Sequence, residues 1–221
     1  MTVDIRVLTL GPIETNCYLV GDTETGQAVV IDPVDDADQI LATTREAGWT
    51  ISLILATHAH FDHVLASKPL KQATGAPFIV HEDSIPLLKN VPQMGMMFLG
   101  RLLPRPAEPD RLLTSEPESI DIGAIHLETR FTPGHAPGHV SFYMPQQKLV
   151  FSGDALFAGS IGRTDLPGGD LDLLMRSIDE QLLTLPDDTR VLPGHGGVTT
   201  IGQERRTNPF IRAYLGDRRS I

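Results

Sequence analysis

A seven-residue segment at positions 57–63, Thr-His-Ala-His-Phe-Asp-His, constrains the fold of this chain more than any other feature. It directly follows residues 51–56, a continuous apolar run that is typical of a strand buried on both faces. Alternate residues on an extended backbone point the same way, so His58 and His60 can converge on one point. The aspartate and the third histidine come just beyond, where a helix could begin. The segment therefore predicts a buried strand that delivers polar side chains to one edge of a sheet.

Three later positions place a similar side chain after a predicted strand. His135 ends the turn Thr-Pro-Gly-His, Asp154 ends Ser-Gly-Asp, and His195 follows Pro-Gly. In each case a preceding glycine permits backbone geometry that other residues resist. Loops held by a rigid scaffold are where functional side chains usually lie. We therefore expect these three residues to join Asp62 and His63 at one site.

Histidine and aspartate together are ligands that suit zinc or iron. The candidates are five histidines and two aspartates. That is too many for one tetrahedral ion and suits two ions that share a bridging ligand. A carboxylate is the natural bridge because it has two oxygens and a charge, and we assign that role to Asp154. A lone buried histidine is more often a packing residue than a ligand, but the clustering favours a metal site.

The remaining pattern predicts an α/β chain with two sheets and helices on their outer faces. Apolar or alternating runs predict strands at 3–10, 16–20, 28–31, 51–56, 77–80, 119–122, 124–132, 139–144, 149–152 and 190–192. Apolar spacing predicts helices at 35–46, 65–73 and 170–183, the last with Asp170 as its N-cap. The methionine- and proline-rich stretch around 84–111 is predicted to be a flap inserted into a single domain spanning 1–221.

Composition excludes several classes of protein. The net charge of the 221-residue chain is −10, so nucleic acid is not expected as a partner. One cysteine rules out an intramolecular disulfide framework. The sequence has no apolar run that would span a membrane and no signal peptide, so we expect a cytoplasmic protein without membrane contact. The apolar cluster at 94–99 suits a dimer contact or a lid, so a monomer and a homodimer both stay open.

Taken as a set, these motifs resemble the metallo-β-lactamase superfamily, in which they occur in the same order. The resemblance runs from about residue 5 to the C-terminus and implies an αββα four-layer sandwich. Carried over residue by residue, it implies one metal held by His58, His60 and His135, a second held by Asp62, His63 and His195, and Asp154 as the bridge. It also implies two divalent ions as cofactors, with zinc expected and iron or manganese as alternatives.

Three further stretches are similar to the glyoxalase II-like, or hydroxyacylglutathione hydrolase-like, branch of that superfamily. These are Asn-Cys-Tyr at 16–18, Gly-Ser-Ile-Gly-Arg-Thr-Asp at 159–165 and Thr-Asn-Pro-Phe at 207–210. The resemblance implies that the enzyme hydrolyses a small anionic thioester, an S-acylglutathione such as S-D-lactoylglutathione, by attack of a metal-bridging hydroxide. Asp62 would be the catalytic residue that orients the hydroxide, in addition to binding metal.

The C-terminal part of the chain departs from that branch. Glyoxalase II proper carries a helical C-terminal extension that helps to bind glutathione, whereas only a short stretch follows His195. Five arginines of this stretch would either meet an anionic substrate or form a solvated basic tail; they are Arg205, Arg206, Arg212, Arg218 and Arg219. Recognition of glutathione is therefore an open question, while the metal chemistry is unaffected.

Three residues near the motifs are candidates for supporting roles. Arg163 and Asp165 lie in a glycine-rich loop soon after Asp154, where they would orient metal ligands or contact substrate. His139 follows His135 by four residues but opens a predicted strand, which favours a supporting or structural role over catalysis.

Other functions stay open on the sequence. Persulfide dioxygenases also carry a Gly-Arg-Thr-Asp like that at 162–165, and this resemblance implies a single iron held by His58, His135 and Asp154. Other hydrolases of the superfamily act on a lactone, a phosphodiester or a β-lactam. A metal-binding or interaction module without catalysis is a further alternative, and it requires an ion with no open coordination position.

Overall fold

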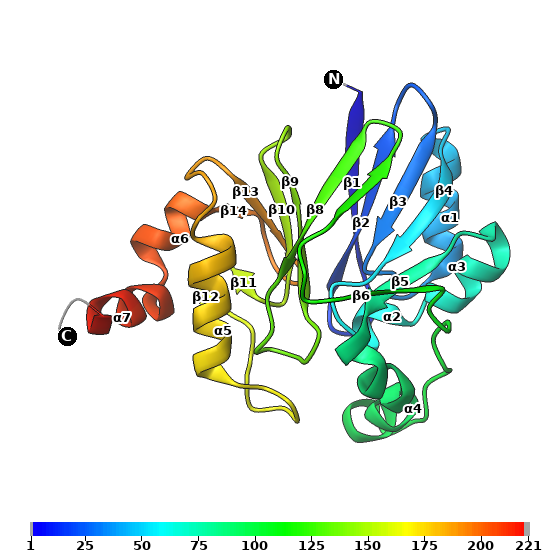
Figure 1. Ribbon diagram of the computed structural model, residues 1–221. Coiled ribbons are helices and arrows are strands. Elements are labelled where there is room, and N and C mark those ends of the chain that lie inside the picture. The colour runs from blue at the N-terminus through cyan, green and yellow to red at the C-terminus, as the bar shows by residue number, and fades with distance from the viewer. Residues whose placement is uncertain (1, 219–221) are drawn as a thin grey trace.

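Two six-stranded sheets face each other at the centre of the molecule (Figure 1). The computed structural model describes residues 2–218. The first sheet has the order β1 (Val3–Leu10), β2 (Thr15–Asp22), β3 (Gln27–Ile31), β4 (Thr50–Leu55), β5 (Phe78–His81), β6 (Arg111–Leu113). The second has the order β14 (Thr199–Thr200), β13 (Arg190–Pro193), β10 (Leu149–Gly153), β9 (Val140–Met144), β8 (Ile125–Phe131), β7 (Ser119–Ile122). A small ribbon pairs β11 (Leu156–Phe157) with β12 (Ser160–Ile161).

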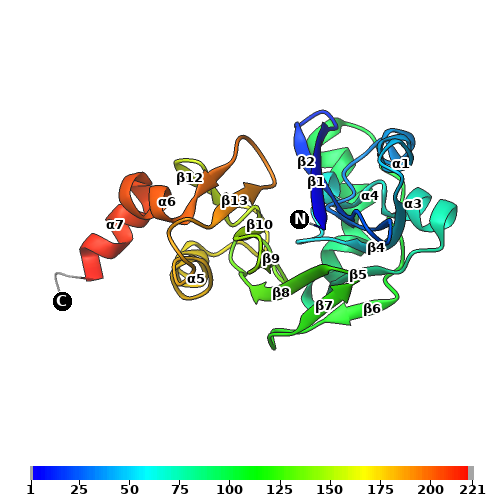
Figure 2. The ribbon, with the colours of Figure 1, turned by 90° about the horizontal axis from the view of Figure 1, so that it is seen from above.

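Helices cover the outer face of each sheet, which gives the fold four layers (Figure 1, Figure 2). On the side of the first sheet lie α1 (Ala37–Glu46), α2 (Phe61–Val64), α3 (Ser67–Thr74), the 3₁₀ turn η1 (Glu82–Ser84) and α4 (Ile85–Leu99). On the side of the second sheet lie α5 (Leu171–Ser177), the π-helical turn η2 (Ile178–Leu182), α6 (Ile201–Thr207) and α7 (Pro209–Arg218). The predicted αββα sandwich is confirmed.

Large apolar side chains from both sheets fill the space between them. Phe142 and Phe151 of the second sheet are fully buried in one cluster with Ile31 and Leu55 of the first. The Tyr18 and Phe151 rings meet across this layer with their centroids 5.1 Å apart. β2 is buried at every position, as expected for a strand covered on both faces.

Two further apolar clusters hold the helices to the outer faces of the sheets. Ile40 of α1 and Leu70 of α3 are buried against the first sheet. Leu174 of α5 and Ile201 of α6 are buried against the second. Asp170 caps α5 as predicted, because its carboxylate accepts a hydrogen bond from the backbone N–H of the third helical residue at 2.9 Å.

The strand directions bring the ends of distant strands to one edge of the sandwich. β3, β4 and β5 run parallel to one another, and β10 runs parallel to β13. β8 shares the direction of β10 because both are antiparallel to β9. Two backbone hydrogen bonds join the sheets at this edge, from Val140 N to Thr57 O at 2.8 Å and from Asn16 N to Gly194 O at 2.7 Å. The loops after β4, β8, β10 and β13 are thereby held close together.

The C-terminal helices α6 and α7 were not predicted from the sequence. The segment that forms them is rich in arginine, and its apolar residues are too few to give a strong helical stripe. Tertiary packing supplies the missing support, since Ile201 and Ile211 are fully buried in the cluster outside the second sheet. The strands β11, β12 and β14 span only two residues each, which is too short for a sequence pattern.

The methionine-rich segment forms one helix, α4, which continues through Pro92. Leu88, Val91 and Met94 on one side of α4 are buried in the cluster outside the first sheet. The following proline cluster is irregular until β6 begins, as expected for residues without a backbone N–H. Among the helices of residues 2–218, none is both long enough and apolar enough to cross a bilayer.

The core between the sheets is testable by removing one ring. Phe142→Ala is expected to lower the free energy of unfolding by about 3–5 kcal/mol, because it leaves a cavity between two sheets that cannot collapse freely. Phe210→Ala serves as the control, since that ring is 45% exposed. Urea unfolding followed by circular dichroism measures both variants. A loss below about 1 kcal/mol for Phe142→Ala would contradict this packing.

Candidate metal centre

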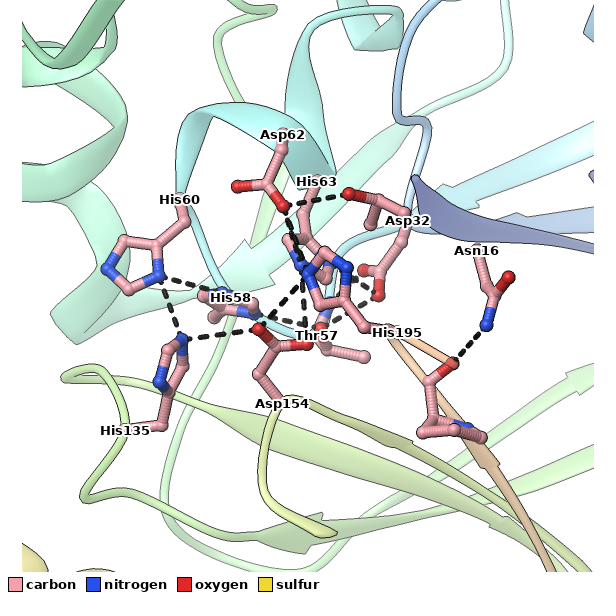
Figure 3. Close-up of polar contacts among 12 residues, drawn as sticks. Asn16, Asp32, Thr57, His58, His60, Asp62, His63, His135, Asp154 and His195 are labelled. Atoms are coloured by element: carbon pink, nitrogen blue, oxygen red, sulfur yellow. Dashed lines mark hydrogen bonds and ion pairs between the residues drawn. The ribbon is translucent and has the colours of Figure 1, made fainter. Parts of the chain in front are cut away.

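The seven histidines and aspartates singled out from the sequence lie together between the two sheets (Figure 3). Those of residues 58–63 come from the loop after β4 and from the short helix α2. His135, Asp154 and His195 follow β8, β10 and β13 of the facing sheet. The site therefore forms only where the two sheets meet, from loops that are distant in sequence.

Three imidazoles form one group of facing nitrogens. His58 Nε2 lies 3.0 Å from His60 Nδ1, and His60 Nδ1 lies 2.9 Å from His135 Nε2. All three side chains are buried, with at most 6% of each residue exposed. The three nitrogens converge on a single point, as alternation along the strand end predicted for the first two.

A second group is formed by one carboxylate and two imidazoles. Asp62 Oδ2 lies 3.3 Å from His63 Nε2 and 3.3 Å from His195 Nε2. Asp154 lies between the two groups, because its Oδ2 is 3.6 Å from His135 Nε2 and 3.4 Å from His195 Nε2. Its Oδ1 is 3.5 Å from His63 Nε2. This position is the one expected of a bridging carboxylate.

The spacing of these atoms fits metal ions. Ligand atoms on a tetrahedral zinc with bonds of about 2.0–2.1 Å lie about 3.3 Å from one another, and the distances of 2.9 to 3.6 Å bracket that value. Two of the atoms, His63 Nε2 and Asp154 Oδ1, are buried without a hydrogen-bond partner. Buried polar atoms without partners are costly, and a cation between them would satisfy both. The donor set therefore suits two divalent ions.

Hydrogen bonds on the far side of each ring leave the facing nitrogen free to bind metal. His63 Nδ1 donates to Asp32 Oδ2 at 2.9 Å, and His135 Nδ1 donates to the backbone oxygen of Arg163 at 2.8 Å. His58 Nδ1 contacts Thr57 Oγ1 at 3.1 Å. When one imidazole nitrogen holds the proton as a donor, the other offers its lone pair, so Nε2 is the atom of each of the three residues that could bind a metal.

The first group is neutral and ready to bind a cation. Burial, followed by the neighbouring His135, lowers the pKa of His60 to about 3. Burial also lowers the pKa of His135, and burial together with His63 and His60 holds the pKa of His58 well below its ordinary value. Because a metal binds only the deprotonated nitrogen, these imidazoles need not release a proton at neutral pH.

The second group concentrates negative charge. Burial alone would raise the pKa of Asp62 and Asp154, but the imidazoles of His63 and His195 together outweigh it and hold both pKa values well below the ordinary range. Burial would lower the pKa of His195, yet its hydrogen bonds to Asp154 and Asp62 raise that pKa to about 10. Two buried carboxylates thus remain charged and attract positive charge to this point.

Sequence reasoning missed three residues that orient the site. Asp32 accepts hydrogen bonds from His63 and from Thr57, whose N and Oγ1 lie 2.7 and 2.9 Å from its two oxygens. Thr15 Oγ1 donates to Asp62 Oδ2 at 2.9 Å. Asp32 could have been found from its position, because it directly follows the apolar strand β3, just as other site residues follow a strand. It also has a φ of 55°, which a non-glycine residue rarely adopts.

The predicted supporting residues lie in different places. His139 is fully buried, and its Nε2 accepts a hydrogen bond from the backbone N–H of Asp154 at 3.0 Å. Arg163 and Asp165 are exposed and pair with each other through two hydrogen bonds of 2.8 and 2.7 Å. The contact of Arg163 with the site is therefore made by its backbone oxygen, which accepts from His135.

The C-terminal arginines are partly engaged elsewhere. Arg205 and Arg206 form ion pairs with Asp187, in the loop before β13. Arg212 lies on α7, outside the second sheet. The side chain of Arg218 and all of Arg219 lie outside the described residues.

The loop that carries His195 packs closely against Asp154. Asn16 Nδ2 donates to Pro193 O and to Gly196 O, both at 3.0 Å. A Cβ at position 194 would collide with Asp154 Oδ1, so only glycine allows this approach.

The four-layer fold and the two adjacent groups of histidine and aspartate side chains are together typical of metallo-hydrolases that bind two metal ions. The model of the metallo-beta-lactamase superfamily matches residues 10–195. The chain therefore belongs to the metallo-beta-lactamase superfamily, as the sequence motifs indicated.

Curated relatives match over nearly their full length. The probable metallo-hydrolase YqgX of Bacillus subtilis (strain 168) is 40% identical over 210 residues, which cover 95% of this chain and 98% of the relative. The hydroxyacylglutathione hydrolase GloC of Haemophilus influenzae is 37% identical over 216 residues, which cover 96% of this chain and 99% of that protein.

Solved structures agree on the fold. BLEG-1, described as a B3 metallo-beta-lactamase, has a TM-score of 0.88 and 40% identity, with 94% of this chain and 99% of that chain covered. TTHA1623 in a di-iron-bound form has a TM-score of 0.84 and 44% identity, with 93% and 99% covered. ETHE1 from Myxococcus xanthus has a TM-score of 0.78 and 31% identity, with 93% and 83% covered.

The contact between Asp32 and His63 generates a test. In Asp32→Asn the amide oxygen can still accept from Thr57, but the amide N–H₂ then faces His63 Nδ1 and donates to it. The ring proton moves to Nε2 and blocks the ligand atom. Metal affinity is expected to fall about 10- to 100-fold, as measured by competition with a chelator. Asp38→Asn, on the exposed side of α1, is the control and should bind metal unchanged. Equal affinities for the two variants would contradict the role of Asp32.

Proposed function

We propose that this protein is a dinuclear metallo-hydrolase that cleaves a thioester, an S-acylglutathione such as S-D-lactoylglutathione. The observation that carries the proposal is the position of Asp154, whose two oxygens face both groups of imidazoles. The similarity to the hydroxyacylglutathione hydrolase GloC over nearly the full length of both chains supports the choice of substrate.

Each group of side chains has a role in this proposal. His58, His60 and His135 would hold one ion, and Asp62, His63 and His195 the other, with Asp154 between them. The chemistry that two such ions supply is Lewis-acid activation of water and of a carbonyl oxygen. We expect zinc, with iron and manganese as alternatives, and the di-iron form of TTHA1623 supports keeping iron among them.

Asp62 has a second task in the proposed reaction. Thr15 and the two imidazoles fix its Oδ2, so the carboxylate cannot turn away from the centre. Its Oδ1 can then accept a hydrogen bond from the attacking water and set the direction of attack on the thioester carbonyl. The water adds to the carbonyl carbon, the carbon–sulfur bond breaks, and the acid and the free thiol leave.

Metal content and thiol release test the proposal directly. Protein purified without added metal is expected to contain two metal ions per chain and to release free thiol from S-D-lactoylglutathione. Exhaustive dialysis against a chelator should abolish the release, and added zinc should restore it. Elemental analysis and a thiol-reactive dye measure the two quantities. Full activity after removal of all metal would end the proposal.

The role of Asp62 has its own test. Asp62→Asn is expected to lower kcat for thiol release by about 10²- to 10⁴-fold at saturating metal, because the neutral amide orients water poorly and binds metal weakly. Asp172→Asn, on the exposed start of α5, is the matched control and should keep full activity. A change of only a few-fold in Asp62→Asn would remove this residue from the mechanism.

A persulfide dioxygenase is the second candidate, and the similarity to ETHE1 fits it. It would use one iron held by His58, His135 and Asp154, with positions left open for oxygen. Oxygen uptake by iron-loaded protein with glutathione persulfide separates it from the hydrolase. One iron per chain with oxygen uptake favours the dioxygenase, and two ions with thiol release favour the thioesterase. Hydrolysis of a β-lactam but not of a thioester would instead point to the activity named for BLEG-1.

A further inference from the structure

A cavity of about 100 Å³ opens beside the candidate metal centre. His60 belongs to its lining, so the cavity is continuous with the first group of imidazoles. One wall is a face of α4, formed by Leu87, Met94, Met97 and Phe98. Leu87 and Met94 also pack against the core, so the apolar surface of α4 continues from its buried side to Met97 and Phe98, which are open to solvent. The Phe98 ring also stacks on the residue after His60, with centroids 5.9 Å apart.

His60 is the one residue that could carry a charge in the described part of the lining. The opposite wall is formed by Leu166 and Pro167 from the loop before α5, and the polar groups on α4 are the amides of Asn90 and Gln93. Among the described residues that line it, none is lysine, arginine, aspartate or glutamate. A carboxylate placed against this wall would lose water without gaining a lysine or arginine partner, so the wall disfavours anionic groups.

Apolar side chains are nevertheless open to solvent at this cavity. Met97 is 75% exposed and Phe98 is 41% exposed. Large apolar side chains exposed together beside a polar site mark a surface that a ligand covers. A ligand in this cavity would lie next to the first group of imidazoles, because His60 is part of the lining.

The size of the cavity limits what enters it. An apolar cavity of about 150 Å³ holds one benzene molecule. A space of about 100 Å³ therefore takes an alkyl group of a few carbons and not a tripeptide. A thiol carrier as large as glutathione must extend elsewhere from the reacting carbonyl, which leaves the acyl side of the thioester for this cavity.

We propose that the cavity between α4 and the loop at 166–167 binds the acyl group of the thioester, and that it selects compact, uncharged, apolar acyl groups. This inference rests on the proposed thioesterase function. Within the S-acylglutathione class it favours compact acyl groups, short alkyl ones such as butanoyl, over dicarboxylic acyl groups.

A series of glutathione thioesters tests the proposal by kinetics. From acetyl to butanoyl, kcat/KM is expected to rise about fourfold for each methylene, because each one leaves water for an apolar wall. The succinyl thioester is expected to fall at least about tenfold below butanoyl, because its carboxylate finds no partner. Equal values across the series, or a preference for succinyl, would overturn the proposal.

Two methionines of one helix provide a matched pair of variants. Met97→Ala removes part of the wall and should reduce the ratio of butanoyl to acetyl kcat/KM about fourfold or more. Met96→Ala is the control, since Met96 is 50% exposed on the same helix but does not line the cavity. Leu87→Lys places a cation in the wall and should raise succinyl relative to butanoyl. An equal ratio of butanoyl to acetyl kcat/KM in Met97→Ala, Met96→Ala and the unaltered protein would contradict the cavity as the acyl-binding site.

A binding measurement separates this inference from the proposed function. Butanamide is an uncharged probe that contains the alkyl group without a scissile bond. Titration of the purified protein with butanamide should shift the methyl NMR signals of Met94 and Met97 but not that of Met96. Shifts without any thioester hydrolysis would support the cavity as a binding site for short alkyl groups and would contradict the proposed thioesterase function. Thioester hydrolysis without acyl preference and without these shifts would overturn the cavity assignment alone.

Discussion

The buried carboxylate of Asp154 is the group on which the rest of the site depends. It is charged, almost fully enclosed, and close to imidazoles that come from both sheets. A buried charge is stable only when opposite charge or ligand bonds compensate for lost water. His139 and Gly194 support this arrangement, since His139 accepts a hydrogen bond from the backbone N–H of Asp154 and Gly194 leaves room for the carboxylate.

The fold meets this requirement through strand direction. Asp154 and His195 follow neighbouring parallel strands of the second sheet, while the residues of positions 58–63 follow β4, which is parallel to its two neighbours in the first. Polar side chains at the carboxyl ends of parallel strands meet at the same edge, and the apolar interior behind them stays dry. Each group of candidate ligands combines residues that follow strands of both sheets. The candidate metal centre therefore forms only because the two sheets pack together.

Much of this arrangement could be predicted because the polar residues interrupt apolar patterns at strand ends. The sandwich, the position of most strands and the gathering of all seven candidate side chains were predictable for that reason; their roles as ligands stay a prediction. Asp32 was missed because a single aspartate before proline also suits an ordinary turn. The helices α6 and α7 were missed because tertiary burial, not local periodicity, stabilises them. The apolar wall on α4 could not be distinguished from core packing, because methionine and leucine serve both purposes.

Helix α4 has one side that packs in the core and another that lines the cavity. Its inner side, with Leu88 and Val91, is fixed by the core, and Gly95 on the same helix has no room for a side chain because Leu103 packs against it. Its other side lines the open cavity with Asn90 and the largely exposed Met97, while Leu87 and Met94 of that wall also pack against the core. Substitutions at Asn90 or Met97, which are exposed, are therefore expected to cost little in folding stability. The acyl preference at the candidate metal centre could therefore be altered through one exposed face of a single helix.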